Sequence, residues 1–239
     1  MKVKMESIYV VMPAYNEEEN IKAVVEDWYP ILDGKSEESR LVIADSGSTD
    51  STHAILTEMQ TQYPQLEILS NTGKQHGPKL IALYNYAIAQ GADYIFQTDS
   101  DGQTNPEEFD AFWQLRADYD VVLGHRIVRG DGKSRYFVEK VVCILLKFYF
   151  GVKVPDANAP FRLMKTSIVE KYMDRFEADY NLPNIMLATF FSHYREKLRF
   201  KTITFKPRQA GTTSINAPKI IRIGWKALDD FHEFKKGLK

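Results

Sequence analysis

Short apolar runs alternate with longer amphipathic stretches over the first hundred residues, and this alternation restricts the fold more than any other feature of the sequence. Predicted strands, rich in β-branched and aromatic residues, lie at 8–12, 40–44, 66–69 and 93–98. Stretches with apolar residues at helical spacing follow the first three. Such alternation is typical of parallel sheets with right-handed crossovers. The sequence therefore predicts an α/β protein with a mostly parallel sheet and helices on both of its faces.

Further elements are predicted in the second half of the chain. Residues 120–123 and 201–205 have strand patterns, whereas 156–162 is rich in turn residues and is predicted to be a loop before another helix. Residues 136–150 are apolar nearly all round a helix, with two lysines as interruptions. Such a helix is either buried in the core or lies in a membrane interface, and all-round hydrophobicity favours burial.

Two helix starts are predicted from capping boxes. Asn16 pairs with Glu19 in the first, and Asn105 pairs with Glu108 in the second. Pro106 fits the first helical position after Asn105, where its missing N–H costs nothing. Each box would start a helix directly after a turn.

The C-terminal part of the chain is basic, although the whole chain has a formal net charge of −1. Residues 201–239 hold nine Lys and Arg against three Asp and Glu. We expect residues 1–215 to form one domain and residues 216–239 to form an amphipathic basic helix that packs on this domain or extends it. A basic end suggests an anionic partner, either a membrane surface or phosphate groups. Nucleic acid is not expected, because no nucleic-acid-binding motif accompanies the charge.

Cysteine content and apolar runs bear on the cellular setting. The single cysteine, Cys143, excludes an internal disulfide and fits a reducing compartment. The apolar run at 8–12 ends at Pro13 and does not have the form of a signal peptide. The run at 141–146 stops at Lys147 and is too short to span a bilayer. We therefore expect a cytoplasmic protein, with peripheral contact at the cytoplasmic face of a membrane as an option.

Three turns that follow predicted strands are rich in small or acidic residues: 13–17, 45–50 and 99–103. The carboxyl ends of parallel strands meet at one edge of a sheet, and ligands of open α/β sheets bind beyond that edge. One such turn is ordinary. Three of them at the same edge predict a nucleotide pocket.

Asp99 and Asp101 lie one residue apart where the predicted strand 93–98 ends. Two carboxylates this close repel each other unless a positive charge lies between them, and a divalent cation that also binds phosphate oxygens would supply that charge. The same Asp-Ser-Asp-Gly stretch is also ordinary turn chemistry, since Asp forms Asx-turns and Gly accepts positive φ. A metal site and a plain turn both stay open on these residues alone.

The ordered motifs of the chain resemble those of the inverting glycosyltransferases of family 2, which have the GT-A fold, and more narrowly those of dolichyl- and polyprenyl-phosphate sugar synthases. The resemblance runs from about residue 8 to residue 214. The matching segments are Pro13-Ala14-Tyr15-Asn16-Glu17, Asp45-Ser46-Gly47-Ser48-Thr49-Asp50, Gly73-Lys74, Asp99-Ser100-Asp101 with Gln103, Gly124-His125-Arg126, Asp156 through Phe161-Arg162, and Arg208 with Gly211. The fold that this resemblance implies is a Rossmann-like GT-A domain with a helical C-terminal extension.

The resemblance also implies roles for individual residues. It implies Mg²⁺ or Mn²⁺ held by Asp99, Asp101 and Gln103 against the diphosphate of a nucleotide sugar, and catalytic roles for Asp101 and Asp156. The residues implied in nucleotide-sugar binding are Pro13, Tyr15, Glu17, Ala44, Asp45, Ser46, Asp99, Ser100, Asp101, Arg126 and Arg208. Metal and guanidinium suit this task because both stabilise the negative charge of a departing nucleoside diphosphate.

Two positions depart from the family pattern. Family members usually carry two Asp residues where this chain has Asp45 and Ser46, so UDP and GDP both stay open as the donor nucleotide. The synthases place a Lys six residues beyond the second arginine, where this chain has Ser214. The corresponding phosphate contact is expected from elsewhere, and the candidates are Lys133, Lys206 and Lys219.

The acceptor is predicted from the need for a general base. A sugar hydroxyl requires one, whereas a phosphate monoester has a second pKa of about 6 and is largely deprotonated at pH 7. The acidic candidates are Asp156, Glu177 and Asp179, and they form no paired acidic motif. The expected reaction is therefore transfer of a hexose or hexosamine from a nucleotide sugar to a polyprenyl phosphate, with residues 136–150 and the C-terminal helix touching the membrane.

Three other functions fit less of the sequence. A soluble family 2 glycosyltransferase would act on a hydroxyl of a cell-surface polysaccharide or glycolipid, with Asp156 or Asp179 as base. A sugar-1-phosphate nucleotidyltransferase would carry a glycine-rich phosphate loop after its first strand, and residues 13–17 contain no glycine. A non-catalytic binding protein would not need Asp99 and Asp101, and both are present.

Overall fold

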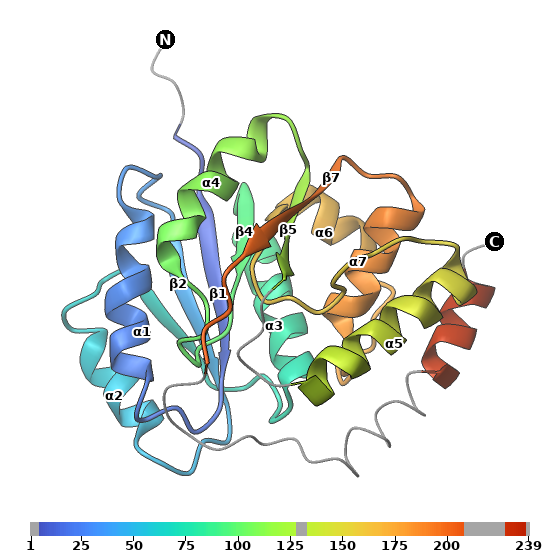
Figure 1. The fold of residues 1–239 in the computed structure, drawn as a ribbon. Coiled ribbons are helices and arrows are strands. Elements are labelled where there is room, and N and C mark those ends of the chain that lie inside the picture. Colours follow the sequence, from blue (N-terminus) through green and yellow to red (C-terminus); the bar gives the residue numbers. More distant parts are fainter. Residues whose placement is uncertain (1–4, 128–132, 208–227, 238–239) are drawn as a thin grey trace.

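The structure is a computed structural model that describes residues 5–127, 133–207 and 228–237, and it contains a seven-stranded sheet with helices on both faces (Figure 1). The strands are β1 (Ile8–Ala14), β2 (Arg40–Asp45), β3 (Leu66–Leu69), β4 (Tyr94–Gln97), β5 (Val121–Arg126), β6 (Arg162–Lys165) and β7 (Leu198–Ile203). The α-helices are α1 (Ile21–Trp28), α2 (Thr52–Met59), α3 (His76–Ala89), α4 (Phe109–Trp113), α5 (Lys133–Phe150), α6 (Thr166–Met173) and α7 (Pro183–His193), and residues 228–236 form a further helix. Short 3₁₀ helices lie at Tyr29–Leu32, Pro106–Glu108 and Gln114–Ala117. The predicted α/β class is confirmed.

One strand reverses the direction of the sheet, whose order is β3-β2-β1-β4-β6-β5-β7. Strands β1 to β4 pair in parallel, while β6 is antiparallel to both β4 and β5. Because the direction reverses on both sides of β6, β5 and its parallel partner β7 run the same way as β4. The carboxyl ends of six strands therefore meet the first residue of β6 at one edge of the sheet.

Strand β6 corrects the prediction that the chain passes from a loop directly into a helix. Its four residues are too few for a periodic pattern, and both of its ends are basic. They form a strand because β4 and β5 offer a ladder on either side, so that Leu163 pairs with Phe96 and with Val122. Strand β7 likewise begins at Leu198, earlier than predicted, because it pairs with β5 from Val121 onward. In both strands the sheet decides the conformation.

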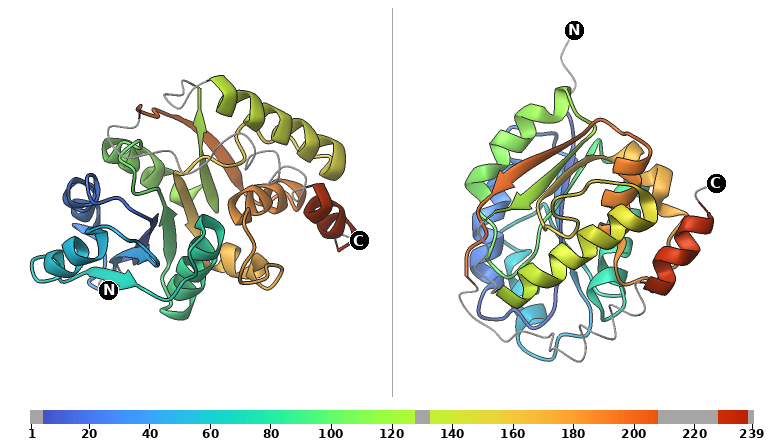
Figure 2. Two further views of the ribbon diagram at one scale, coloured as in Figure 1. Left: turned by 90° about the horizontal axis from the view of Figure 1, so that it is seen from below. Right: turned by 45° about the vertical axis from the view of Figure 1, so that its right-hand side comes forward.

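Helices cover both faces of the sheet, as Figure 2 shows from two further directions, and the central strands β1 and β4 are buried on both faces. Along β1, Ile8, Val10 and Met12 pack in the layer that holds α1, α2 and α4. The alternate residues Tyr9 and Val11 pack in the layer that holds α3, α6 and α7. A strand buried on both faces reads as a continuous apolar run, which is why β1 was recognisable in the sequence.

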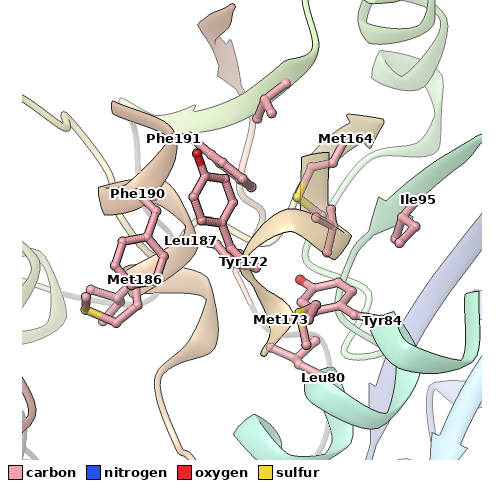
Figure 3. Packing of buried hydrophobic residues seen from close by; sticks show 14 of the residues in the cluster. Leu80, Tyr84, Ile95, Met164, Tyr172, Met173, Met186, Leu187, Phe190 and Phe191 are labelled. Atoms are coloured by element: carbon pink, nitrogen blue, oxygen red, sulfur yellow. The ribbon is translucent and has the colours of Figure 1, made fainter. Parts of the chain in front are cut away.

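Aromatic rings and methionines fix the helices on the second layer (Figure 3). The ring of Tyr172 in α6 stacks on Phe190 of α7 with centroids 5.6 Å apart and meets the edge of Phe191 at 5.7 Å. Leu80 and Tyr84 reach the same cluster from α3. This packing holds α3 and α7 together behind β4, where the acidic turn begins.

Helix α5 departs from the burial that its composition predicts. Leu146 and Phe150 lie in the core, but Phe137, Ile144 and Phe148 are 69%, 67% and 79% exposed. The helix is apolar all round because its outward face is apolar as well as its inward face. In the described parts of the chain, no helix is long and apolar enough to cross a bilayer.

Neither predicted capping box forms. Asn16 adopts a positive φ of 55°, and α1 begins only at Ile21, with Asn20 in the capping position. Pro106 does open a 3₁₀ helix, but its neighbour Asn105 makes no capping hydrogen bond. The side chain of Asn16 instead bonds Thr49 in the turn after β2, and that of Asn105 donates to the Glu107 carboxylate at 3.4 Å.

The helix at 228–236 lies on the domain through two aromatic residues. Phe231 is fully buried, with its ring 5.8 Å from that of Phe150. Phe234 packs against Phe176, Tyr180 and Phe190. The predicted boundary at 215 and 216, with the first part of the predicted helix, lies outside the described residues.

The close approach of α3 to the segment before α7 gives a test of the fold. A Cβ on Gly77 would lie 2.3 Å from the carbonyl oxygen of Tyr180 and 2.5 Å from Cα of Asn181, both backbone atoms. Gly77→Ala should therefore lower the free energy of unfolding by about 1–3 kcal/mol, measured by urea denaturation. Gly237→Ala is the control, because its Cβ would meet nothing closer than 3.6 Å. Equal stability of both variants would contradict the packing.

Candidate active site

Three turns come together at the carboxyl edge of the sheet, as the sequence predicts. Ala14 of β1 lies beside Asp45 of β2 in the parallel register. The hydroxyl of Ser100, which is buried, donates a 2.8 Å hydrogen bond to the carbonyl oxygen of Pro13. Ser100 thus ties the turn after β4 to the end of β1 and holds Asp99 and Asp101 in front of the first two turns.

The turns after β1 and β2 are joined by hydrogen bonds. The amide N–H of Asn16 donates to Ser48 Oγ at 3.0 Å, and Asn16 Oδ1 accepts from the amide of Thr49 at 2.8 Å. The left-handed backbone of Asn16 makes both bonds possible, and Asn tolerates that conformation better than most residues. The amide of Glu17 donates to Thr52 Oγ1 at 2.8 Å. The two turns therefore form one rigid rim.

The predicted nucleotide-binding residues on this rim differ in exposure. Tyr15 is 44% exposed, whereas Pro13, Ala44 and Glu17 are buried. The buried carboxylate of Asp45 accepts a short hydrogen bond from Ser48 Oγ and lies 3.0 Å from Nδ1 of His53. Ser46 is half-buried. Asp45 is thus built into the rim, and the ring of Tyr15 projects from it.

Lys79 is a site residue that the sequence analysis missed. Its side chain is 1% exposed, and its Nζ donates a short hydrogen bond to the carbonyl oxygen of Ala14 and lies 5.2 Å from the ring centroid of Tyr15. Burial lowers the pKa of this amino group to about 8, against the opposing effect of the Asp45 carboxylate. A lysine on the apolar face of a predicted helix was the available signal, because such a position needs a polar partner inside the fold.

The acidic pair lies at the mouth of the same edge. Asp99 Oδ1 accepts a 3.2 Å hydrogen bond from Nε2 of Gln97 and lies 3.3 Å from Nε2 of His76. Asp101 Oδ1 accepts from the amide of Gln103 at 3.1 Å. The side chain of Gln103 is buried, and its amide nitrogen donates to the carbonyl oxygen of Lys206 at 2.7 Å. Gln103, which was predicted as the third metal ligand, thus also holds the backbone at Lys206 in place.

These residues suit a cation that shares its coordination with a ligand. Among the described residues, no three His, Cys, Asp or Glu side chains form a ready-made metal cluster. Mg²⁺ in phosphate-binding sites is typically held by one or two carboxylates together with phosphate oxygens and waters. Asp99 and Asp101 supply two carboxylates at one place, so the donor set fits a divalent cation that arrives with a diphosphate.

A buried polar network stands behind Asp99. Asn184 of α7 donates from Nδ2 to Gln97 Oε1 at 3.0 Å and accepts from the hydroxyl of Tyr84 at 2.6 Å. The opposite end of the Gln97 amide donates to Asp99. Three buried side chains from β4, α3 and α7 therefore orient one carboxylate.

The same network includes the fully buried Arg162 at the start of β6. Its guanidinium donates to the carbonyl oxygens of Ala159 at 2.9 Å and Asn184 at 2.8 Å, and by a short bond to that of Ala157. Arg162 pairs with Gln97 across the β4–β6 ladder. It thus connects the acidic turn with the loop that leads into β6.

The other side of the edge holds a buried ion pair. Arg126, the last residue of β5, donates from Nε and from one terminal nitrogen to the two carboxylate oxygens of Asp156, each at 2.8 Å. Glu139 of α5 accepts from the amide of Ala157 at 2.7 Å, and its other oxygen lies 3.8 Å from the Arg126 guanidinium. The centroid of the Phe205 ring lies 5.0 Å from Cζ of the same guanidinium. Two residues predicted for separate roles, Arg126 and Asp156, are therefore held by each other.

The other candidates are acidic residues before α7 and basic residues of the second half of the chain. Glu177 and Asp179 are exposed in the segment between α6 and α7. Arg208 and Lys219 lie outside the described residues. The side chain of Lys133 is likewise not described, whereas Lys206 is exposed beside Gln103.

Comparison with known proteins identifies the family. The model of glycosyl transferase family 2 matches residues 9–173, which is more than half of the chain. The chain belongs to glycosyl transferase family 2. It is therefore a glycosyltransferase, and the predicted family and enzyme class are confirmed.

Two curated relatives of this glycosyltransferase are similar over a large part of the chain. An undecaprenyl-phosphate 4-deoxy-4-formamido-L-arabinose transferase of Pectobacterium carotovorum is 24% identical over 225 residues, which cover 94% of this chain and 67% of the relative. A polyprenol monophosphomannose synthase of Mycolicibacterium smegmatis is 25% identical over 174 residues, which cover 68% of this chain and 63% of the relative. The chain spans about two thirds of the length of these relatives.

The fold is also found in solved structures. Glucosyl-3-phosphoglycerate synthase of Mycobacterium tuberculosis, in complex with Mn²⁺, UDP-glucose and phosphoglyceric acid, matches with a TM-score of 0.71 at 18% identity. The match covers 95% of this chain and 80% of that chain. The predicted GT-A type of fold is confirmed.

The buried amino group of Lys79 predicts a pH-dependent stability. Its pKa is about 8 in the folded chain, below its ordinary value of 10.5, so between these pH values the unfolded state binds more protons. Stability contributed by this group should therefore rise from pH 8 towards pH 10.5. Lys79→Met should lose that rise relative to the native chain, in urea unfolding at pH 7.5, 8.5 and 9.5. Lys165→Met, which removes a surface bond to Asp120, should keep it; an unchanged pH slope in Lys79→Met would refute the assignment.

Proposed function

We propose that this glycosyltransferase is metal-dependent and inverting, and that it transfers a sugar from a UDP- or GDP-linked donor to a polyprenyl phosphate. The observation that carries the acceptor is the Arg126–Asp156 pair. Both oxygens of Asp156 accept hydrogen bonds from a guanidinium, and the residue is 2% exposed. A general base must reach the proton that it removes, so this geometry favours an acceptor that needs no base.

The donor would lie across the rim formed by the turns after β1, β2 and β4. The residues that would contact its base, ribose and phosphates are Pro13, Tyr15, Glu17, Ala44, Asp45, Ser46, Asp99, Ser100, Asp101, Arg126 and Arg208. The exposed ring of Tyr15 suits stacking on a nucleobase. The buried Asp45 would act mainly by holding the rim, because it is bonded to Ser48 and adjoins His53.

Asp99 and Asp101, with Gln103, would hold Mg²⁺ or Mn²⁺. The bound ion would neutralise the negative charge that develops on the departing nucleoside diphosphate. Within the protein, Gln97 and Asn184 orient the Asp99 carboxylate for this task. The solved structures of glucosyl-3-phosphoglycerate synthase support the choice of ion, since they are complexes with Mn²⁺ or Mg²⁺ together with UDP-glucose or UDP.

In the proposed reaction, a phosphate oxygen of the acceptor attacks the anomeric carbon from the face opposite the nucleotide. The bond between that carbon and the diphosphate oxygen breaks, so the configuration inverts. The acceptor phosphate has a second pKa of about 6 and is already deprotonated at pH 7. Asp156 would then act as a positioning residue that aims the guanidinium of Arg126 at a phosphate group.

The names of the curated relatives support this acceptor. One is named for undecaprenyl phosphate and the other for polyprenol monophosphomannose. A second candidate is a family 2 enzyme that glycosylates a hydroxyl of a polysaccharide or glycolipid. It is favoured by the structural match to a synthase of glucosyl-3-phosphoglycerate, and it would need Asp156 or the exposed Asp179 as base.

The donor site is tested by thermal unfolding with UDP, UDP-sugars, GDP and GDP-mannose, each with and without Mn²⁺. One nucleotide family should stabilise the protein in a metal-dependent way, by about 2.7 kcal/mol at a hundredfold over its dissociation constant. Asp99→Asn and Asp101→Asn should each lose most of this effect. Asp174→Asn, at the exposed end of α6, should keep it. No stabilisation by any nucleotide at millimolar concentration would disprove the donor site.

The acceptor is tested with radiolabelled donor and three acceptors: a short polyprenyl phosphate, the matching polyprenol and 3-phosphoglycerate. We expect labelling of the polyprenyl phosphate at a rate at least about a hundredfold above that of the polyprenol, which lacks a pre-ionised nucleophile. Asp179→Asn should not change this rate. Preferred labelling of a hydroxyl acceptor, abolished in Asp179→Asn or Asp156→Asn, would support the second candidate instead.

A further inference from the structure

The outward face of α5 carries a row of exposed apolar side chains. Phe137, Val141, Ile144 and Phe148 follow one another at intervals of four, three and four residues, which places them in one stripe along the helix. All four are exposed, and three of them are more than 60% exposed. At 1.5 Å per residue the row is about 16 Å long. Scattered exposed apolar residues need no explanation, but a continuous row marks an interaction surface.

The inward face of the same helix is already in use. Leu146 and Phe150 lie in the hydrophobic core, and Glu139 bonds the amide of Ala157 next to the Arg126–Asp156 pair. The outward row is therefore not a core-packing face that has been exposed by a shift of the helix. It is a second apolar face, which a helix on the surface of a globular protein would ordinarily make polar.

The charges beside the row are positive. Lys140 and Lys147 lie one heptad apart along one flank of the stripe, and Lys133 occupies the position a further heptad before them in the sequence. Lys147 is exposed, whereas Lys140 is half-buried and its Nζ donates a 3.4 Å hydrogen bond to the carbonyl oxygen of Pro155. The single acidic residue of α5 is Glu139, which is buried and faces the site. The outward surface of α5 therefore combines large apolar side chains with lysines and carries no carboxylate of its own.

This composition discriminates between two occupants. A second copy of the chain would meet α5 through a two-fold axis, so the patch would have to complement itself, and a patch with lysines and no carboxylate does not. An anionic bilayer surface complements both features, because apolar side chains enter the acyl boundary while lysines extend to lipid phosphates. We propose that Phe137, Val141, Ile144 and Phe148, flanked by Lys140 and Lys147, form a docking face for an anionic membrane surface.

The docking face would locate the proposed transfer reaction at a membrane surface. This part of the inference rests on the proposed function. The two faces of α5 are separated by about one helix diameter, 10–12 Å. Docking through the outward face would put the Arg126–Asp156 pair, beside Glu139, about that far behind the lipid surface. A phosphate on a membrane-embedded polyprenyl chain would then enter the site from the same side.

The test is sedimentation of the full chain with vesicles of phosphatidylcholine, with and without 30 mol% phosphatidylglycerol. We expect binding to the anionic vesicles that weakens as salt is raised. The double variant Ile144→Ser/Phe148→Ser should bind at least about tenfold more weakly, and Lys147→Ala about fivefold more weakly. Met5→Ser, which removes an exposed apolar side chain elsewhere, should bind as the native chain does.

The outcomes separate this proposal from the proposed function. Vesicle binding unchanged in the Ile144/Phe148 double variant would overturn the docking face, as would a native dimer in light scattering that this double variant dissociates. Nucleotide-dependent thermal stabilisation should be the same in the native chain and in the α5 variants. Loss of nucleotide binding with intact vesicle binding would overturn the donor site alone.

Discussion

Both halves of the structure depend on the hydrogen bonds that the guanidinium of Arg162 donates. It lies in the interior with no exposed surface and donates to three backbone carbonyl oxygens, from Ala157, Ala159 and Asn184. Burial lowers its pKa, an effect opposed chiefly by Tyr84 and Asp156. An unpaired buried polar group costs about 1–3 kcal/mol and a buried charge more, so Arg162 is compatible with burial only while all these partners are in place. The partners belong to the loop before β6 and to α7, which fixes both against β4.

Much of the fold could be predicted because the local pattern and the final environment agree. β1 and β2 are apolar runs that end in turn residues, and both are buried as such runs should be, whereas the border strand β3 has only Leu66 fully buried. The elements that were missed are those whose conformation comes from their neighbours. β6 has four residues and two basic ends, and it becomes a strand because β4 and β5 lie on either side of it. Helix α5 was judged by its composition, which cannot distinguish a helix buried all round from one with two different apolar faces.

The candidate site likewise contains residues that could be predicted from the sequence and residues that could not. The acidic turn and the two turns of the rim were recognisable, since each places special residues within a few positions of one another. Lys79, Asn184 and Tyr84 were not, because their partners are distant in sequence: Tyr84 and Asn184 are 100 residues apart, and Lys79 and Ala14 are 65 apart. Residue types alone also could not predict that Arg126 and Asp156 form an ion pair with each other. Such pairings depend on the order of the strands, which brings the end of β5 to the edge where β4 ends.

That strand order also leaves β3 and β7 at the two borders of the sheet. A border strand offers unpaired backbone groups to any other extended chain, and proteins commonly protect it by shortness or by charge. β3 has four residues and includes Glu67, whose carboxylate pairs with Arg40 of β2. β7 carries Arg199 and Lys201. The border strand to which a further strand could add on this side of the sheet is therefore β7, which carries two basic residues. Like charges on this strand oppose edge-to-edge association of two molecules.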